Sequence, residues 1–299
     1  MKSSLPEHVY GSRPTKRDRR TQADIALLKK TIYDVIAEEN PVTVRQTYYQ
    51  LVSRGAIAKT EAEYKAVVRL LGIMRREHEL PFGWIADYTR WMRKPTTWNS
   101  LRNMLEQSHK LYRRDLWNHQ PSYVEIWLEK DALAGVIYRV THEYDVPLMI
   151  TRGYPSLSFI HTAAEQIAAQ NKPTYLYYFG DFDPSGLDIT RSVEADIRTF
   201  APNAEIHFER VAVTKEQITD LNLPTRPTKK TDSRSRNFDG GESVEVDAIS
   251  PAALRKLVEA CIVPHIDRDV LAGLERVEKD ERDILESIIE RLDQSRDSA

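Results

Sequence analysis

The chain has 299 residues, of which 41% are hydrophobic and 29% charged, so it is long enough for about two domains with hydrophobic cores of their own. Its formal net charge of −2 excludes a histone-like tail protein and an acidic disordered chaperone. A single cysteine, Cys261, excludes a disulfide scaffold and a zinc site ligated by cysteines.

Several kinds of sequence signal are missing as well. The first residues hold no apolar segment of the secretory kind, and no apolar run approaches the roughly 18 to 20 residues of a membrane helix, so we expect a cytoplasmic protein with no membrane partner. Neither glycine-rich phosphate-binding pattern, G-x-x-x-x-G-K-[ST] or G-x-G-x-x-G, is present. Any ATP that drives this protein is therefore expected to bind a separate subunit.

The charge is divided unevenly between the two parts of the chain. Residues 1–120 hold 22 Lys and Arg against 13 Asp and Glu, a balance of +9, and the remainder holds 21 against 32, a balance of −11. The basic residues also cluster, which indicates a polyanion partner, most commonly nucleic acid, although charge also drifts between halves by chance. Residues 1–20 are polar and predict a flexible basic arm, with Arg17, Arg19 and Arg20 as DNA-backbone contacts.

Residues 21–95 predict a mainly helical domain. Apolar residues recur at 3- and 4-residue steps over 22–39, which predicts a helix. Thr43 and Gly55 are typical start and stop residues of a second helix at 44–54, a third helix is predicted at 61–77, and residues 80–85 predict an extended segment. Three short helices and an extended return on a basic background are typical of a winged-helix DNA-binding domain, in which one helix enters a groove. Residues 96–120, rich in Arg and aromatic side chains, predict a connecting helix.

Residues 121–260 have a different pattern. Predicted strands at 123–129, 147–151, 174–180 and 206–213 alternate with predicted helices at 132–144, 157–170 and 187–200. Such alternation indicates an α/β domain with a doubly wound, mostly parallel sheet.

The last part of the chain begins with a polar segment. Residues 224–243 predict a mobile loop, in which Lys229, Lys230 and Arg234 are candidate DNA contacts with solvated charge as the alternative. A last strand at 244–247 and a helix from Pro251 follow. Residues 261–299 predict a charged helical segment that either packs on its own domain or supports a dimer.

Three carboxylates stand at the predicted ends of strands. Glu129 ends the first strand of the α/β unit, and Asp181 and Asp183 end the third. Residues i and i+2 of a strand point to the same side, and ligands of open parallel sheets bind beyond the carboxyl ends of the strands. Three oxygen ligands without His or Cys favour Mg²⁺, with Mn²⁺ as a second choice. The plain alternative is an acidic turn after a strand.

Three segments in this order resemble a known family. Residues 129–132 (EKDA), 152–156 (RGYPS) and 180–187 (GDFDPSGL) together resemble the Toprim domain that the DNA-cleaving subunit of topoisomerase VI shares with the meiotic double-strand-break protein. In that family a winged-helix domain precedes the Toprim domain and carries the catalytic tyrosine in a T-x-R-x-x-Y-Y pattern, which residues 43–49 (TVRQTYY) match. The resemblance covers residues 22–260 and implies that Tyr49 is the nucleophile, with Arg45 one helical turn before it.

The resemblance implies Mg²⁺-dependent cleavage of double-stranded DNA by an isomerase-class enzyme. Tyr49 would form a 5′-phosphotyrosyl link, Glu129, Asp181 and Asp183 would hold the metal, and Arg45, Lys130 and Arg152 would supply positive charge at the scissile phosphate. Further expectations are a homodimer, a nucleoid location and a separate ATPase subunit. Two other functions stay open: a Toprim nuclease that hydrolyses DNA with metal-activated water, and a non-catalytic DNA-binding module.

Overall fold

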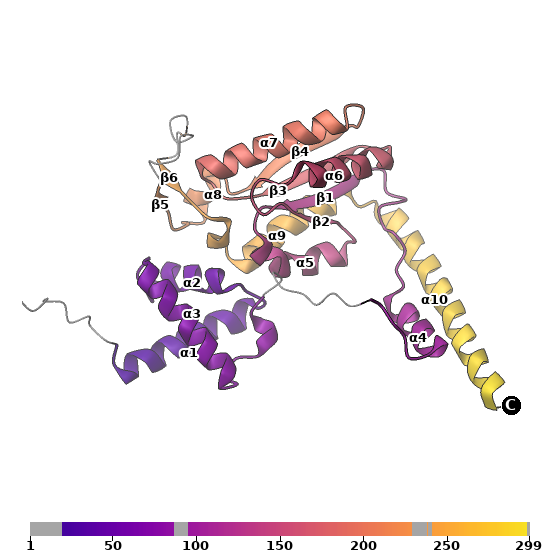
Figure 1. The fold of residues 1–299 in the computed structure, drawn as a ribbon, viewed down its shortest axis with the longest axis horizontal. Helices are drawn as coiled ribbons and strands as arrows, with labels where there is room; N and C mark the ends of the chain where they lie inside the picture. Colours follow the sequence, from indigo (N-terminus) through magenta and orange to yellow (C-terminus); the bar gives the residue numbers. More distant parts are fainter. Residues whose placement is uncertain (1–19, 87–94, 229–237, 239–240, 298–299) are drawn as a thin grey trace, which may run out of the picture.

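A computed structural model of the chain describes residues 20–86, 95–228, 238 and 241–297. Its parts are a helical N-terminal module over residues 20–86, a central α/β unit, and a helical arm formed by one helix before that unit and one after it (Figure 1). Five predicted DNA contacts lie outside the described residues, together with most of the basic arm: Arg17, Arg19, Lys229, Lys230 and Arg234.

The three predicted N-terminal helices are confirmed. They are α1 (Gln22–Glu39), α2 (Val44–Ser53) and α3 (Glu61–Arg76). The Thr21 and Thr43 side chains each accept a hydrogen bond from the backbone N–H of the third helical residue, and the side chain of that residue accepts one from the backbone N–H of the threonine. These capping boxes fix where α1 and α2 begin. The helices bury Leu28, Ile32 and Val35 of α1 together with side chains of α2 and α3 in a shared core.

The extended segment predicted at residues 80–85 is mostly a turn. Pro81 precedes the 3-10 helix η1 (Phe82–Trp84). Within residues 80–85 only Ile85 forms a β-type pairing, an isolated parallel bridge to Val42. Proline fixes φ near the value that such a turn needs, which favours the turn over a strand here. The described residues of the N-terminal module thus contain this single bridge and no β-hairpin.

The parallel sheet is confirmed. It consists of β1 (Tyr123–Leu128), β2 (Leu148–Ile150), β3 (Thr174–Phe179) and β4 (Ile206–Ala212), in the order β2-β1-β3-β4 with every pairing parallel. The chain therefore adds β2 on one side of β1 and then β3 on the other. This reversal places a topological switch point between β1 and β3, where ligands of open α/β sheets bind.

Helices cover both faces of the sheet, as a doubly wound fold requires. In Figure 1, α6 and α7 lie on one face, and α5 and α9 lie on the other. Alternate residues of β1 divide between two cores, because Ile126 joins the cluster that reaches the N-terminal module and Trp127 joins the cluster under α6 and α7. The helices are α5 (Ala134–Glu143, preceded by the 3-10 helix η2, Asp131–Leu133), α6 (Leu157–Gln170), α7 (Pro184–Phe200), α8 (Lys215–Asp220) and α9 (Pro251–Ile262, followed by η5, Val263–His265).

The predicted strand at residues 244–247 is mostly wrong, because only Val244 pairs, in an isolated antiparallel bridge to Phe182. The segment contains the 3-10 helix η4 (Val246–Ala248), and the nearby strands β5 (Arg226–Pro227) and β6 (Glu242–Ser243) form a separate two-stranded ribbon. The physical reason is that the Val246 N–H donates to Asp181 Oδ1, at 2.9 Å, and not to a neighbouring strand.

The predicted connecting helix at residues 96–120 is shorter than expected. Helix α4 (Leu101–Leu111) begins after its cap Ser100 and packs against the C-terminal helix α10 (Arg268–Asp297). The Tyr112 hydroxyl donates to Glu281 at 2.5 Å, and Arg282 donates to the Tyr112 carbonyl at 2.6 Å. The C-terminal helix therefore packs against α4 of the same chain, while Ile284 and Val277 of α10 remain exposed. Its support of a dimer stays a prediction.

Within the described residues, no helix combines the length and the apolar character that a membrane crossing requires.

The buried carboxyl of Glu125 on β1 gives a testable pH dependence. Its side chain accepts a hydrogen bond from Trp127 Nε1 at 2.8 Å, and burial raises its pKa from 4.5 to about 7. As the pH rises, the Glu125 carboxyl ionises in the unfolded chain before it ionises in the folded one. The contribution of Glu125 to the free energy of unfolding is therefore fully present below pH 4.5 and is lost as the pH rises to 7. We expect Glu125→Gln to exceed the wild-type free energy of unfolding by about 2 to 3 kcal/mol at pH 8.

Urea unfolding at pH 4 and pH 8 measures this difference, and pH 4 serves as the control. The two proteins should be equally stable at pH 4, because Glu125 is then neutral in both the folded and the unfolded wild-type chain. Equal stability at pH 8 would show that the carboxyl is ionised without penalty in the folded protein.

Candidate functional site

Two of the three predicted metal ligands meet at the switch point. Glu129 follows β1 and Asp181 follows β3, and the two strands are neighbours with Leu128 opposite Phe179. The backbone N–H of Asp181 donates to Glu129 Oε2 at 3.1 Å. The strand order therefore brings together two carboxylates that are 52 residues apart in the chain.

Asp183 has a structural role of its own. Strand β3 ends at Phe179, so the alternation of a strand no longer applies at residue 183, and Asp183 instead caps α7 by accepting from the Gly186 N–H at 2.8 Å. Ser185 lies within the first turn of α7. Arg226 lies 3.7 Å from the second carboxylate oxygen of Asp183.

Two glycines allow the close approach of Glu129 and Asp181. A Cβ on Gly180 would lie 2.6 Å from Glu129 Oε2, and a Cβ on Gly186 would lie 2.3 Å from the Asp181 carbonyl oxygen. Both distances are shorter than real Cβ contacts, so a side chain at Gly180 would displace the Glu129 carboxylate and one at Gly186 would displace the backbone of the turn. The G-D-x-D-P-S-G segment therefore needs both glycines for packing.

The carboxylates at the switch point repel each other. Burial, together with Asp181 and Asp183, raises the pKa of Glu129 to about 7, and burial raises the pKa of Asp181 despite the nearby Lys130. A divalent cation would favour the ionised form of such a pair, and oxygen donors are the ligands that Mg²⁺ prefers. The donor set thus suits Mg²⁺ chemically. As the side chains stand, however, no three His, Cys, Asp or Glu residues of the described chain are arranged to hold a metal ion.

Lys130 lies at the centre of the acidic cluster. Its ammonium is 3.0 Å from Asp181, 3.1 Å from Glu245 and 2.6 Å from Asp247. Although burial opposes its charge, the three carboxylates raise the pKa of Lys130. Glu245 and Asp247 were not predicted. The only sequence signal for them is a pair of acids in the otherwise apolar segment 244–249.

Glu245 links the N-terminal module to the α/β unit. It accepts from Arg45 of α2, and Arg226 of β5 lies 2.8 Å from its other oxygen. Burial opposes ionisation of Glu245, but Lys130 and Arg45 outweigh burial and lower its pKa to about 2. The predicted residues Arg45 and Lys130 therefore meet on one carboxylate that the sequence did not single out.

Tyr49 lies beside this cluster on the same chain. It is 5% exposed, and burial and Glu245 raise its pKa to about 12 although Arg45 and Lys130 act in the opposite direction. The Lys59 ammonium is 5.5 Å from the centre of the Tyr49 ring and donates to the Pro224 carbonyl at 2.8 Å. A cavity of about 270 Å³ next to the ring is lined by Arg45, Tyr48, Tyr49, Lys59, Thr60, Glu61, Tyr64 and Arg226.

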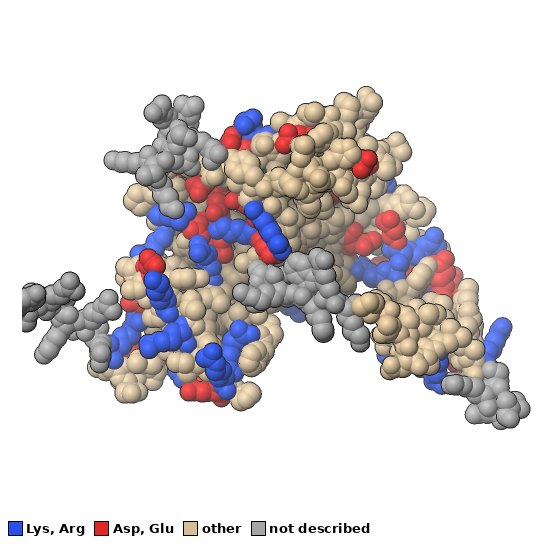
Figure 2. All heavy atoms as spheres, viewed as in Figure 1, with Lys and Arg blue, Asp and Glu red and all other residues tan. Residues whose placement is uncertain are grey.

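Two other predicted cations, Arg152 and Arg20, each pair with a carboxylate. Arg152 adopts a positive φ of 54° and contacts Asp131 at 2.8 Å, in the wall of a cleft of about 600 Å³ that also includes Arg45, Lys130 and Glu129. Arg20 instead pairs with Glu63 of its own module at 2.6 Å. Figure 2 shows Lys and Arg gathered on the N-terminal module, and Asp and Glu gathered where that module meets the α/β unit.

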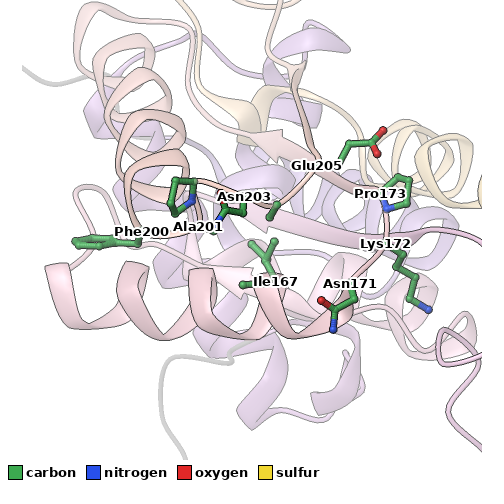
Figure 3. A pocket seen from close by; sticks show the side chains of 11 residues that line it. Ile167, Asn171, Lys172, Pro173, Phe200, Ala201, Asn203 and Glu205 are labelled. Atoms are coloured by element: carbon green, nitrogen blue, oxygen red, sulfur yellow. The ribbon is translucent and has the colours of Figure 1, made fainter.

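A separate cavity lies at the amino ends of the strands, opposite the switch point. It has a volume of about 550 Å³ and is formed around the amino ends of β3 and β4, with Ile167, Lys172, Phe200 and Glu205 among its lining residues (Figure 3). Lys172 already donates to the backbone carbonyls of Trp117 and Gln120. Since Glu205 is the only carboxylate in this lining, the cavity lacks the convergent acids found at the switch point.

No protein-family model matches this chain, and no curated protein matches it either. The fold and the site define an α/β protein with a doubly wound parallel sheet and a cluster of acids and cations at its switch point.

Proposed function

We propose that this protein is a Mg²⁺-dependent DNA-cleaving transesterase that uses Tyr49 as its nucleophile. The observation that carries the proposal is the position of α2. Its Arg45 pairs with Glu245, and Glu245 in turn contacts Lys130 at the carboxyl ends of β1 and β3. Tyr49, one helical turn after Arg45, is therefore held beside the carboxylates that suit a divalent cation.

The proposal includes a finer domain assignment. The N-terminal helices with the T-x-R-x-x-Y-Y segment are interpreted as a winged-helix domain, and the α/β unit as a Toprim domain like that of the DNA-cleaving subunit of topoisomerase VI. Motif order supports this assignment, since the tyrosine segment precedes the Glu-Lys pair and the D-x-D pair. Within the described part of the N-terminal module, Val42 and Ile85 form an isolated parallel bridge.

In the proposed reaction, the Tyr49 oxygen attacks a backbone phosphorus of DNA and the bond from phosphorus to the 3′ oxygen breaks. The phenol loses its proton and the 3′ oxygen takes one up, so the products are a 5′-phosphotyrosyl link and a free 3′ hydroxyl. One phosphodiester replaces another, so resealing needs no ATP. Bound Mg²⁺ supplies stabilisation of the charge that develops on the phosphate. Arg45 and Arg152 are the cations suited to bind the phosphate oxygens.

The surroundings of Tyr49 set a condition on this reaction. A buried phenol with a pKa of about 12 is a poor nucleophile at neutral pH, so Tyr49 needs exposure and positive charge before it reacts. In the family that the motifs resemble, the tyrosine and the metal meet across a dimer, whereas Tyr49 here lies beside the carboxylates of its own chain. We propose a homodimer in which each protomer cuts one strand of the duplex. Strand passage would require a separate ATPase subunit.

The burial of Tyr49 also favours a second candidate. A Toprim nuclease would use the same carboxylates to activate water and would not need the tyrosine. The two candidates differ in their products, because only the transesterase leaves protein attached to the 5′ end.

The test is cleavage of supercoiled plasmid by the full chain with Mg²⁺, with Mn²⁺ or with EDTA, followed by SDS and by electrophoresis with and without protease. The proposal expects breaks that appear only with a divalent cation and whose DNA enters the gel normally only after protease. Asp181→Asn, which removes one charge from the cluster, should lower the yield of breaks by about 10²-fold or more.

Breaks that need no protease would support the nuclease in place of the transesterase. Tight DNA binding with no breaks in any cation would support a non-catalytic DNA-binding module and reject both enzymes.

A further inference from the structure

We infer that Asp247 is a ligand of the divalent cation, in place of Asp183, and that the ammonium of Lys130 occupies the position of that cation when it is absent. The inference rests on the proposed function only in taking a divalent cation as the ligand. Neither the motif pattern nor the resemblance pointed to residue 247.

The first observation is convergence. Asp181, Glu245 and Asp247 come from the end of β3 and from the segment around η4, and all three place a carboxylate oxygen within 3.1 Å of the Lys130 ammonium. The three residues are 8%, 5% and 1% exposed. Ionised groups are kept at such burial only when opposite charge compensates them. Oxygen atoms arranged around one positive charge are the surroundings that a hard cation also requires.

The second observation is an oxygen without a partner. Asp247 uses Oδ2 to contact Lys130, but its Oδ1 is buried and accepts no hydrogen bond. Asp247 lines the same cleft as Glu129 and Lys130. An unpaired buried carboxylate oxygen is costly, and native proteins keep few such atoms without a reason. A bound cation with two positive charges would provide the missing partner.

Asp183 is different in both respects. One of its oxygens accepts from the Gly186 N–H at 2.8 Å as the cap of α7, and Arg226 lies 3.7 Å from the other. Each oxygen of Asp183 thus has a contact, whereas Asp247 Oδ1 is buried with no hydrogen-bond partner among the described residues. The structure therefore favours Asp247 over the second acid of the D-x-D pair.

Because a divalent ion and the ammonium cannot share one position, cation binding is an exchange with Lys130. Removing the ammonium should then strengthen cation binding, which is the opposite of what a lysine needed only for folding would do. Asp183→Asn is the matched control for Asp247→Asn, since asparagine caps a helix about as well as aspartate and the change removes the same charge.

The test is isothermal titration calorimetry of Mn²⁺ into the full chain, with thermal unfolding of each variant as a check on folding. We expect Asp247→Asn to raise the dissociation constant about tenfold or more, and Asp183→Asn to raise it less than about threefold. Lys130→Met should lower the dissociation constant several-fold, and Mn²⁺ should raise its Tm more than that of the wild type.

The inference is overturned if Asp247→Asn binds Mn²⁺ as the wild type does, if Asp183→Asn has the larger effect, or if Lys130→Met binds Mn²⁺ no better than the wild type. If Asp247→Asn does not fold, the Lys130→Met titration decides alone. Failure of the proposed function is separate, because Mn²⁺ binding with the expected order of variants and no plasmid cleavage would leave the cation site standing and reject the transesterase.

Discussion

Replacing Tyr49 with phenylalanine is expected to lower the yield of covalent protein–DNA adduct by about 10³-fold or more, because the attacking oxygen is removed while the ring still fills its buried position. The adduct is measured by radiolabelling the DNA, digesting it with nuclease and following the label that stays on the protein in SDS gels. Tyr49 is 5% exposed and its ring centre lies 5.3 Å from that of Tyr48, so the two phenols are close enough for either to be mistaken for the nucleophile.

Tyr48→Phe is the matched control. The Tyr48 hydroxyl donates to the Thr60 carbonyl at 3.3 Å, so this change should cost about 0.5 to 1.5 kcal/mol of stability and leave the adduct yield within about threefold of the wild type. Loss of the adduct in Tyr48→Phe alone would assign the nucleophile to Tyr48. Cleavage that survives in both variants would assign the reaction to water.

Much of the fold could be predicted because its signals are local. Three of the four strands of the α/β unit are mainly apolar, β4 mixes apolar with charged residues, and helical patterns separate the strands. The three N-terminal helices begin at threonine caps. Where local signals were mixed, the prediction failed. Residues 80–85 contain apolar side chains typical of a strand, but Pro81 and a 3-10 turn prevent one.

The candidate site was predicted only in part, since its remaining members come together through tertiary contacts. Placing Glu129 and Asp181 at strand ends required only the element order, but their contact depends on β3 pairing with β1. Glu245 and Asp247 lie more than 60 residues after Asp181, and their alternation with Val244 and Val246 predicts a strand. The hydrogen bond from Val246 to Asp181 forms a turn there instead and brings both acids to Lys130.

Glu245→Gln is expected to lower the free energy of unfolding by about 3 to 5 kcal/mol at pH 7 in EDTA. Glu245 is 5% exposed and compensates three cations: Arg45 on the N-terminal module, Lys130 after β1, and Arg226 on β5. Removing its charge leaves these cations facing one another, and glutamine cannot replace the charge although it keeps an oxygen acceptor. Arg45 and Arg226 reach solvent, which places the expected loss at the lower end of this range.

Urea unfolding measures the loss, and Glu61→Gln is the control. Glu61 pairs with Lys65 on the exposed face of α3, where the pair should contribute less than about 0.5 kcal/mol. Since Glu245 joins the two parts of the molecule, its loss should also speed limited proteolysis between residues 76 and 123, where the N-terminal module leads into the α/β unit. A variant as stable as the wild type would mean that the apolar core shared by the two parts holds α2 in place without the ion pairs, and that Arg45 is positioned beside the acidic cluster by packing alone.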